Sequence, residues 1–168
     1  FTPTTTFAGL WGVPFIQITR HISTHDAGII VSAIFLGWIV GAPLVGLLTN
    51  ALETRKRILC AGVIASFIIL IKIIYFPSSS YNITIIMMFL LGLFSSTEIL
   101  VFSVAHDIIP YSLAGTAISL TNMLVMVSGI MQYIIGSSIE LISSVGSTEL
   151  QMIEKISAHD FEIAFLIM

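Results

Sequence analysis

Ile108–Ile139 reads IIPYSLAGTAISLTNMLVMVSGIMQYIIGSSI and carries no formal charge. Ala27–Leu52 and Ile73–Thr97 are nearly as apolar. A helix needs about 20 apolar residues to cross the hydrocarbon core of a bilayer, at about 1.5 Å of rise per residue. Uncharged runs of this length, repeated along one chain, are typical of a polytopic membrane protein.

The overall composition agrees with this interpretation. Hydrophobic residues make up 57% of the 168-residue chain and charged residues only 9%, whereas soluble domains carry about 25% charged residues. Mean hydropathy is +1.07. Because backbone polar groups find no water in lipid, only helices or closed barrels can span it, and these runs are too long for barrel strands. The sequence therefore predicts an all-α integral membrane protein built as a helical bundle.

Charge and motif content exclude several function classes. The net charge of −3 is small and scattered, which argues against a nucleic-acid partner. Cys60 is the single cysteine of the chain and cannot form an intramolecular disulfide. The sequence holds no zinc motif and no phosphate-binding P-loop. We expect no cofactor, no metal site and no enzymatic activity, and we expect membrane lipid as a partner.

The apolar runs are separated by polar or turn residues, and these breaks define the predicted spans. The spans are 7–19 (partial), 27–48, 58–76, 83–105, 113–139 and 161–168 (partial). Short connections make consecutive helices antiparallel neighbours. Because the first and last spans are too short to cross a bilayer, we expect residues 1–168 to be one transmembrane half-domain, cut inside both terminal helices.

A longer polar connection, Leu141–Asp160, precedes the last span. Within it, Thr148-x-x-Gln151 resembles a helix capping box, which predicts a short interfacial helix. The alternative is a solvated loop with an irregular turn.

The orientation in the membrane follows from the basic residues of the short loops. Arg55, Lys56 and Arg57 lie together between the second and third spans, whereas Arg20 and Lys155 in the other loops have acidic neighbours. The sequence therefore predicts that the 55–57 side is cytoplasmic, together with the loop 106–112, and that the loop at Pro77 is external.

The end of the second span carries a more specific pattern, Gly46-Leu-Leu-Thr-Asn50-Ala-Leu-Glu-Thr-Arg55-Lys56-Arg57. It resembles the signature loop of the major facilitator superfamily (MFS), in which a Gly and an acid four residues later precede a basic pair. In that family the loop is cytoplasmic and gates the inward-facing movement. Asn50 stands where the family has Asp, and the basic run is displaced by one residue. The alternative is a positive-inside anchor with a turn.

Three other segments resemble helices of the same family. Phe7–Phe15, with Trp11 and Pro14, resembles the seventh helix, whose aromatic residue and kinking proline face the central cavity. Residues 89–94 resemble the tenth helix. Residues 115–122, followed by Gly129, Gln132 and Gly136, resemble the eleventh.

The resemblance covers nearly the whole chain and implies the carboxy-terminal half of a twelve-helix MFS transporter, in which six helices form two inverted three-helix repeats. It implies secondary active transport of a small-molecule substrate by alternating access, as a symporter or antiporter. It further implies a bacterial plasma membrane and a missing amino-terminal half as partner.

Glu98 is the strongest single candidate for a functional residue. It lies inside the fourth predicted span, where an unpaired ionised acid costs roughly 2.5–3.5 kcal/mol on insertion scales. One interpretation is a group that carries a proton or contacts substrate. The other is a carboxylic acid that is hydrogen-bonded to a neighbouring helix or reaches toward the interface.

Four more polar or aromatic side chains at membrane depth are candidates for the substrate cavity, although interhelical hydrogen bonding explains the polar ones equally well. They are Trp11, Gln17, Asn122 and Gln132. Separately, small residues recur four apart and predict close helix packing. These pairs are Gly37 with Gly41, Gly92 with Ser96, and Gly115 with Ser119.

Two hypotheses compete with transport. A membrane-embedded enzyme or sensor would need paired catalytic residues at membrane depth, and Glu98 has no such pair in the sequence. A structural subunit without transport activity would use Glu98 only to hold helices together.

Overall fold

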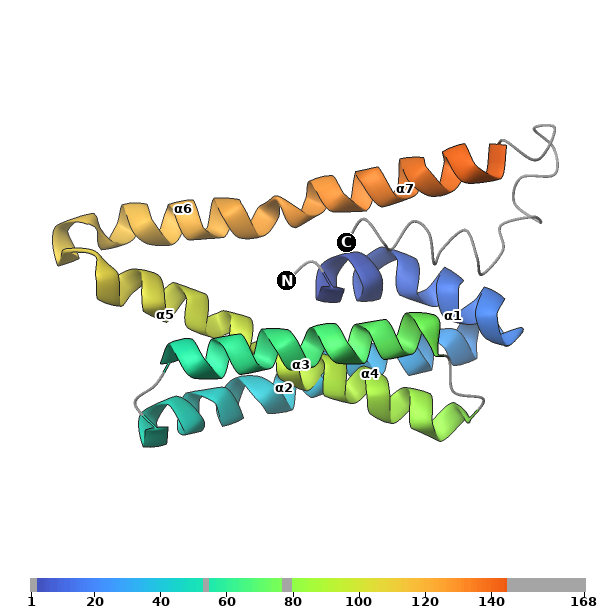
Figure 1. Ribbon diagram of the computed structural model, residues 1–168, viewed down its shortest axis with the longest axis horizontal. Helices are drawn as coiled ribbons and strands as arrows, with labels where there is room; N and C mark the ends of the chain where they lie inside the picture. Colours follow the sequence, from blue (N-terminus) through green and yellow to red (C-terminus); the bar gives the residue numbers. More distant parts are fainter. Residues whose placement is uncertain (1–2, 53–54, 77–79, 145–168) are drawn as a thin grey trace.

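The computed structural model describes residues 3–52, 55–76 and 80–144, all of whose regular elements are helices (Figure 1). The predicted interfacial helix near Thr148 and the last partial span lie outside the described residues. In chain order the elements are the π-helix η1 (Pro3–Trp11), α1 (Gly12–Arg20), α2 (Thr24–Leu52), α3 (Arg55–Tyr75), α4 (Tyr81–Ser95), the 3₁₀-helix η2 (Ser96–Glu98), α5 (Ile99–Ile108), the 3₁₀-helix η3 (Tyr111–Leu113), α6 (Ala114–Met126) and α7 (Ser128–Ser144).

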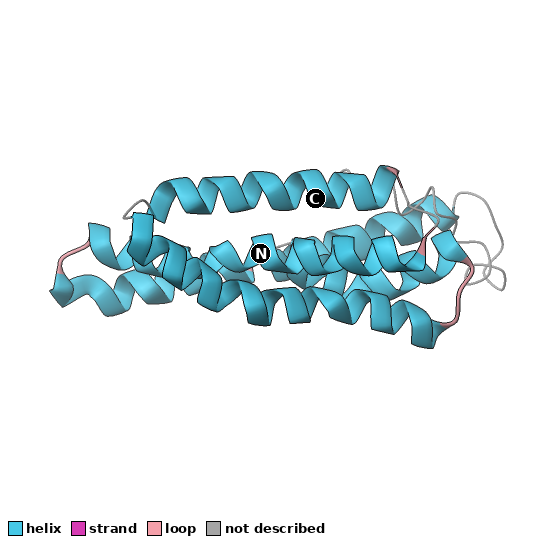
Figure 2. Ribbon diagram, turned by 90° about the horizontal axis from the view of Figure 1, so that it is seen from below, coloured by secondary structure: helices cyan, strands magenta, loops and turns pink. Residues whose placement is uncertain are grey.

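Among the described residues, three helical segments are long and apolar enough to cross a membrane, namely Thr24–Asn50, Arg55–Tyr75 and Tyr81–Ile108. They include or closely match the predicted spans 27–48, 58–76 and 83–105. The helices extend along one long axis (Figure 2). The described chain is therefore an all-α membrane helical bundle, as the composition predicts.

The most extensive helix contact among the described residues joins α2 to α4. A methyl group added at Gly92 would overlap the backbone carbonyl of Ile34, and one added at Gly37 would overlap that of Phe89. Only the absence of a side chain lets the two backbones approach this closely.

One turn further along this contact, the same pairing continues. Gly41 of α2 faces the side chain of Ser96, and a methyl group at Gly41 would overlap it. The prediction of close packing is thus confirmed for Gly37 with Gly41 and for Gly92 with Ser96.

The third small pair behaves differently. A methyl group at Gly115 would meet nothing within 4 Å, and Ser119 is exposed, its hydroxyl donating back to the Gly115 carbonyl. The packing prediction is wrong for this pair among the described residues. Small residues four positions apart allow another helix to pack closely against that surface. They do not determine whether the fold places a helix there.

The first span begins as a π-helix and changes to an α-helix at Gly12. Pro14 lies two residues beyond this change, and a proline removes one backbone donor from the helical ladder, so a local change of winding is expected here. The rings of Phe7 and Phe15, on either side of the change, meet edge to face with centroids 5.6 Å apart. Both rings are fully buried and belong to the main core, whose other large, fully buried members are Ile16, Ile30, Ile34, Met88, Leu91 and Ile135.

α2 begins with a reciprocal cap. The backbone N–H of Asp26 donates to the Ser23 hydroxyl at 3.1 Å, and that hydroxyl donates to the Asp26 carboxylate at 2.7 Å. An acid in the first turn also complements the helix dipole. These two bonds define where α2 begins, directly after Ser23.

The predicted span 113–139 is not one uninterrupted helix. α6 ends at Met126 and α7 begins at Ser128, and at Val127 the backbone bonds tighten to the third residue back. A Ser128–Gly129 pair follows at once, a combination that commonly interrupts helices. The two helices lie end to end along one edge of the bundle (Figure 1).

Candidate functional site

The third long span is interrupted in its middle by the single 3₁₀ turn η2, Ser96–Glu98. The hydroxyls of Ser96 and Thr97 donate to the carbonyls three residues before them, at 2.7 and 2.9 Å. Such bonds compete with the regular α-helical pattern, which is why a run of hydroxyl residues favours a local change of winding. A stretch of 3₁₀-helix within a longer helix often marks a functional hinge.

η2 packs against two helices at once. Ser96 lies against Gly41 of α2, and the side chain of Thr97 occupies the space that a side chain at Gly62 of α3 would need. Both Ser96 and Thr97 are buried. The turn is therefore held between α2 and α3.

A pocket of about 220 Å³ opens between α3 and this turn. Its polar lining consists of Ser66, Ser95, Thr97 and Glu98, and its apolar lining of Leu59, Val63, Phe67 and Val101. The Ser95 hydroxyl lies 3.4 Å from the Ser66 hydroxyl, and Ser66 donates to the Gly62 carbonyl at 2.8 Å. One carboxylate oxygen of Glu98, Oε2, is fully buried. Glu98 thus shares one pocket lining with three hydroxyl residues, which come from α3, α4 and η2.

Trp11 and Gln132 lie at a different contact. The Trp11 ring packs against Gly136 of α7, where an added methyl group would come within 3.0 Å of it. Gln132 precedes Gly136 by one helical turn and shares its face. This contact also contains the buried Ile135, which ties α7 to the main core.

Gln17 and Asn122 take no part in either contact. Gln17 is half-buried on α1, and Asn122 is exposed on α6. The five cavity candidates are therefore spread over separate regions of the described structure.

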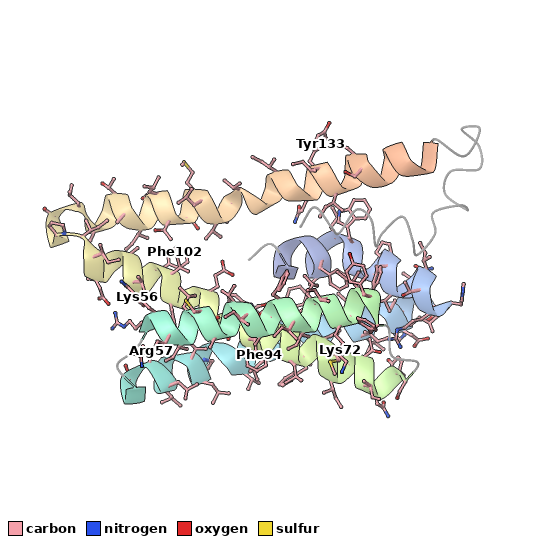
Figure 3. All side chains as sticks on the ribbon, in the orientation of Figure 1. Lys56, Arg57, Lys72, Phe94, Phe102 and Tyr133 are labelled. Atoms are coloured by element: carbon pink, nitrogen blue, oxygen red, sulfur yellow. The ribbon has the colours of Figure 1, made fainter. Side chains whose placement is uncertain are left out.

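The loop resembling the family signature lines an open cleft of about 710 Å³ at one end of the bundle. Lys56 and Arg57 lie at this end, near α5 (Figure 3). Arg55 forms an ion pair with Asp107 of α5. Gly46 is exposed and has no neighbour where a side chain would begin, whereas the exposed Asn50 lines the cleft.

Asp107 is a further candidate functional residue, which the sequence does not single out. The sequence places His106 and Asp107 at a solvated helix end, where they suggest little chemistry. The signal was available, because the predicted topology puts residue 107 at the same membrane face as Arg55–Arg57. Asn50 is not an acid, whereas Asp107 places a carboxylate in the same cleft from another helix.

The opposite end of the bundle gathers Arg20, Lys72 and Phe76 around a small cavity with Ile83 and Thr84. Partial burial lowers the pKa of the Arg20 guanidinium from its ordinary value. The loops after α1 and α3 therefore share one end of the bundle, and the loops after α2 and α5 share the other. Which end is cytoplasmic stays a prediction of the charge count.

Comparison with known families gives one match. A family model described as Major Facilitator Superfamily matches residues 2–139. Searches of curated proteins and of solved structures found no match.

Proposed function

The chain belongs to the Major Facilitator Superfamily, a family of membrane transporters, and from this premise we propose that it forms one half of a secondary active transporter. It moves a small solute by alternating access, together with an amino-terminal half of the same protein. The transported solute would occupy the space between the two halves, as substrate sites of such folds lie near the bilayer midplane at the repeat interface.

The observation that carries the proposal is the position of Glu98. It lies in a 3₁₀ interruption inside a span of membrane length and lines a pocket with three hydroxyl residues. Ionisable residues at membrane depth are expensive, and they mark ion or substrate pathways. Interrupted helices beside such residues are a recurring feature of transporter binding sites.

Glu98 couples transport to a proton gradient in this proposal. It is the titratable residue among the described residues that line the pocket. A carboxylate is poorly solvated when the pocket is closed, so it takes up a proton, and an aqueous path opening to one side of the membrane lets that proton leave. Alternation of the two accessible states then links proton movement to solute movement.

The ion pair between Arg55 and Asp107 acts as the cytoplasmic gate of this half. It joins the start of α3 to the end of α5 across the cleft. Both side chains are substantially exposed, so water screens the pair and its contribution to folding stability is small. The pair links α3 to α5 but contributes little to the free energy of folding. Such a contact suits a gate that has to open in each transport cycle.

Reversing one charge of this pair is expected to slow transport, and reversing both is expected to restore it. Arg55→Asp places two acids together, which favours the open gate, and adding Asp107→Arg recreates an opposite-charge pair. The measurement is the initial rate of solute uptake into proteoliposomes.

The matched control for this pair is Arg57→Asp, which changes the same charge in the same cleft without touching the ion pair. Adding Asp107→Arg to Arg57→Asp should give no rescue. Equal rescue of both single variants would mean that the net charge of the cleft matters and the pair does not.

The direct test of the proposed function is reconstitution of the complete protein into liposomes. A panel of small metabolites is offered with an imposed proton gradient, and counterflow is measured for any solute that enters. Accumulation that disappears when a protonophore dissipates the gradient supports the proposal. Absence of both accumulation and counterflow across a broad panel would favour a structural subunit.

A further inference from the structure

The pocket beside η2 has a chemical character that a proton-carrying carboxylate alone does not require. Every polar side chain in its described lining ends in oxygen, namely the hydroxyls of Ser66, Ser95 and Thr97 and the carboxylate of Glu98. Oxygen ligands of this kind are what hard cations prefer.

The three hydroxyls of the lining donate their protons to backbone carbonyls or to one another. Ser66 donates to the Gly62 carbonyl at 2.8 Å, and Thr97 donates to the Phe94 carbonyl at 2.9 Å. Ser95 donates toward Ser66 over 3.4 Å. A hydroxyl carries one donor and two acceptor sites, so Thr97 keeps acceptor capacity on its oxygen, and Ser66 keeps one acceptor site beside the bond that it accepts from Ser95.

The charge of the lining selects the valence of the ion. One carboxylate neutralises one monovalent cation, whereas a divalent cation would leave an uncompensated charge inside the membrane, where charge is costly. The pocket volume of about 220 Å³ is well above the roughly 10–15 Å³ that one water needs, so the pocket accommodates an ion with a few waters.

We propose that the pocket between α3 and η2 is a binding site for an alkali cation, with Glu98 as its charged ligand and Ser66, Ser95 and Thr97 as hydroxyl ligands. The interruption at η2 fits this role, since irregular helical backbone coordinates Na⁺ in other transporter architectures. Cation binding and protonation are alternative states of one carboxylate. The inference thus deepens the proposed coupling role of Glu98, but its test measures binding and does not depend on transport.

The test is equilibrium binding of ²²Na⁺ to the purified complete protein in lipid nanodiscs, with N-methylglucamine holding the ionic strength constant. Wild-type protein should bind Na⁺ saturably. Glu98→Gln should abolish saturable binding, and Ser66→Ala should weaken it by about tenfold, the effect of losing one hydrogen-bond-strength contact to a charged group.

The matched control is Ser119→Ala on α6. Its hydroxyl makes the same kind of bond to the carbonyl four residues back, at 2.9 Å to Gly115, but it lies outside the pocket. Ser119→Ala should bind Na⁺ as the wild type does. If Ser66→Ala is not monodisperse, Ser95→Ala tests the same ligand shell from the other helix.

Absence of saturable Na⁺ binding to the wild type would overturn the inference, as would equal binding by the pocket variants and the control. The outcomes also separate the two proposals. A protein that accumulates solute on a proton gradient but binds no Na⁺ keeps the proposed function and loses this inference. A protein that binds Na⁺ at this pocket but transports nothing keeps the inference and loses the function.

Discussion

Replacing Glu98 by Gln is expected to reduce gradient-driven solute accumulation to the level of protein-free liposomes, while counterflow exchange is retained. The amide keeps the shape of the carboxyl group and removes its ability to release a proton. Exchange needs no net proton release, so it survives. The measurement is uptake by reconstituted protein over a range of external pH, where the variant should also lose the pH dependence of accumulation.

The control for this change is Asp26→Asn. It removes an acid from the cap of α2, at a surface position away from the η2 pocket, and should leave accumulation intact. If Glu98→Gln accumulates solute normally with an unchanged pH profile, Glu98 is a structural hydrogen-bonding group. If the variant fails to reach the membrane, the packing role is the better explanation.

Substituting Gly92 by Ala is expected to destabilise the protein by about 1–3 kcal/mol or more, the usual cost of overfilling a packed interior. The added methyl group would overlap the Ile34 carbonyl of α2, and a backbone atom cannot move aside as the end of a flexible side chain can. α2 and α4 must then separate along their whole contact. Thermal unfolding of the detergent-solubilised protein measures the effect.

Gly28→Ala is the matched control for this substitution. Gly28 lies on α2, and a methyl group there meets nothing within 4 Å. Alanine is favoured over glycine inside a helix by up to about 1 kcal/mol, so this variant should be neutral or more stable. Equal melting of Gly92→Ala and wild type would contradict the close approach of α2 and α4.

The long apolar runs made the helices predictable, because a membrane-length stretch without charges has few alternatives in lipid. The spacing of Gly37 with Gly41 and of Gly92 with Ser96 also identified surfaces that pack closely. The same spacing at Gly115 did not, since a small residue permits contact only where the fold brings another helix.

The surroundings of Glu98 were harder to predict. Ser66 and Ser95 lie 29 residues apart in sequence, and hydroxyls in membrane helices usually bond to their own backbone, so neither stands out. The pairing of Arg55 with Asp107 likewise depends on how the end of α5 returns to the start of α3. The hydroxyl lining near Glu98 and the Arg55–Asp107 pair both arise from tertiary packing between helices. The periodicity of residues along one helix does not encode such packing.

The helices of the bundle differ in length. α2 has 29 residues and α3 has 21, which correspond to about 44 Å and about 32 Å at 1.5 Å per residue. Against a hydrocarbon core of about 30 Å, α3 matches the bilayer, whereas α2 has to tilt or carry its ends into the headgroups. The capped start at Ser23 and the polar end at Asn50 suit the headgroup region. α2 and α3 therefore respond differently to the thickness of the surrounding membrane. A change in lipid chain length alters the fit of α2 to the bilayer before it alters the fit of α3.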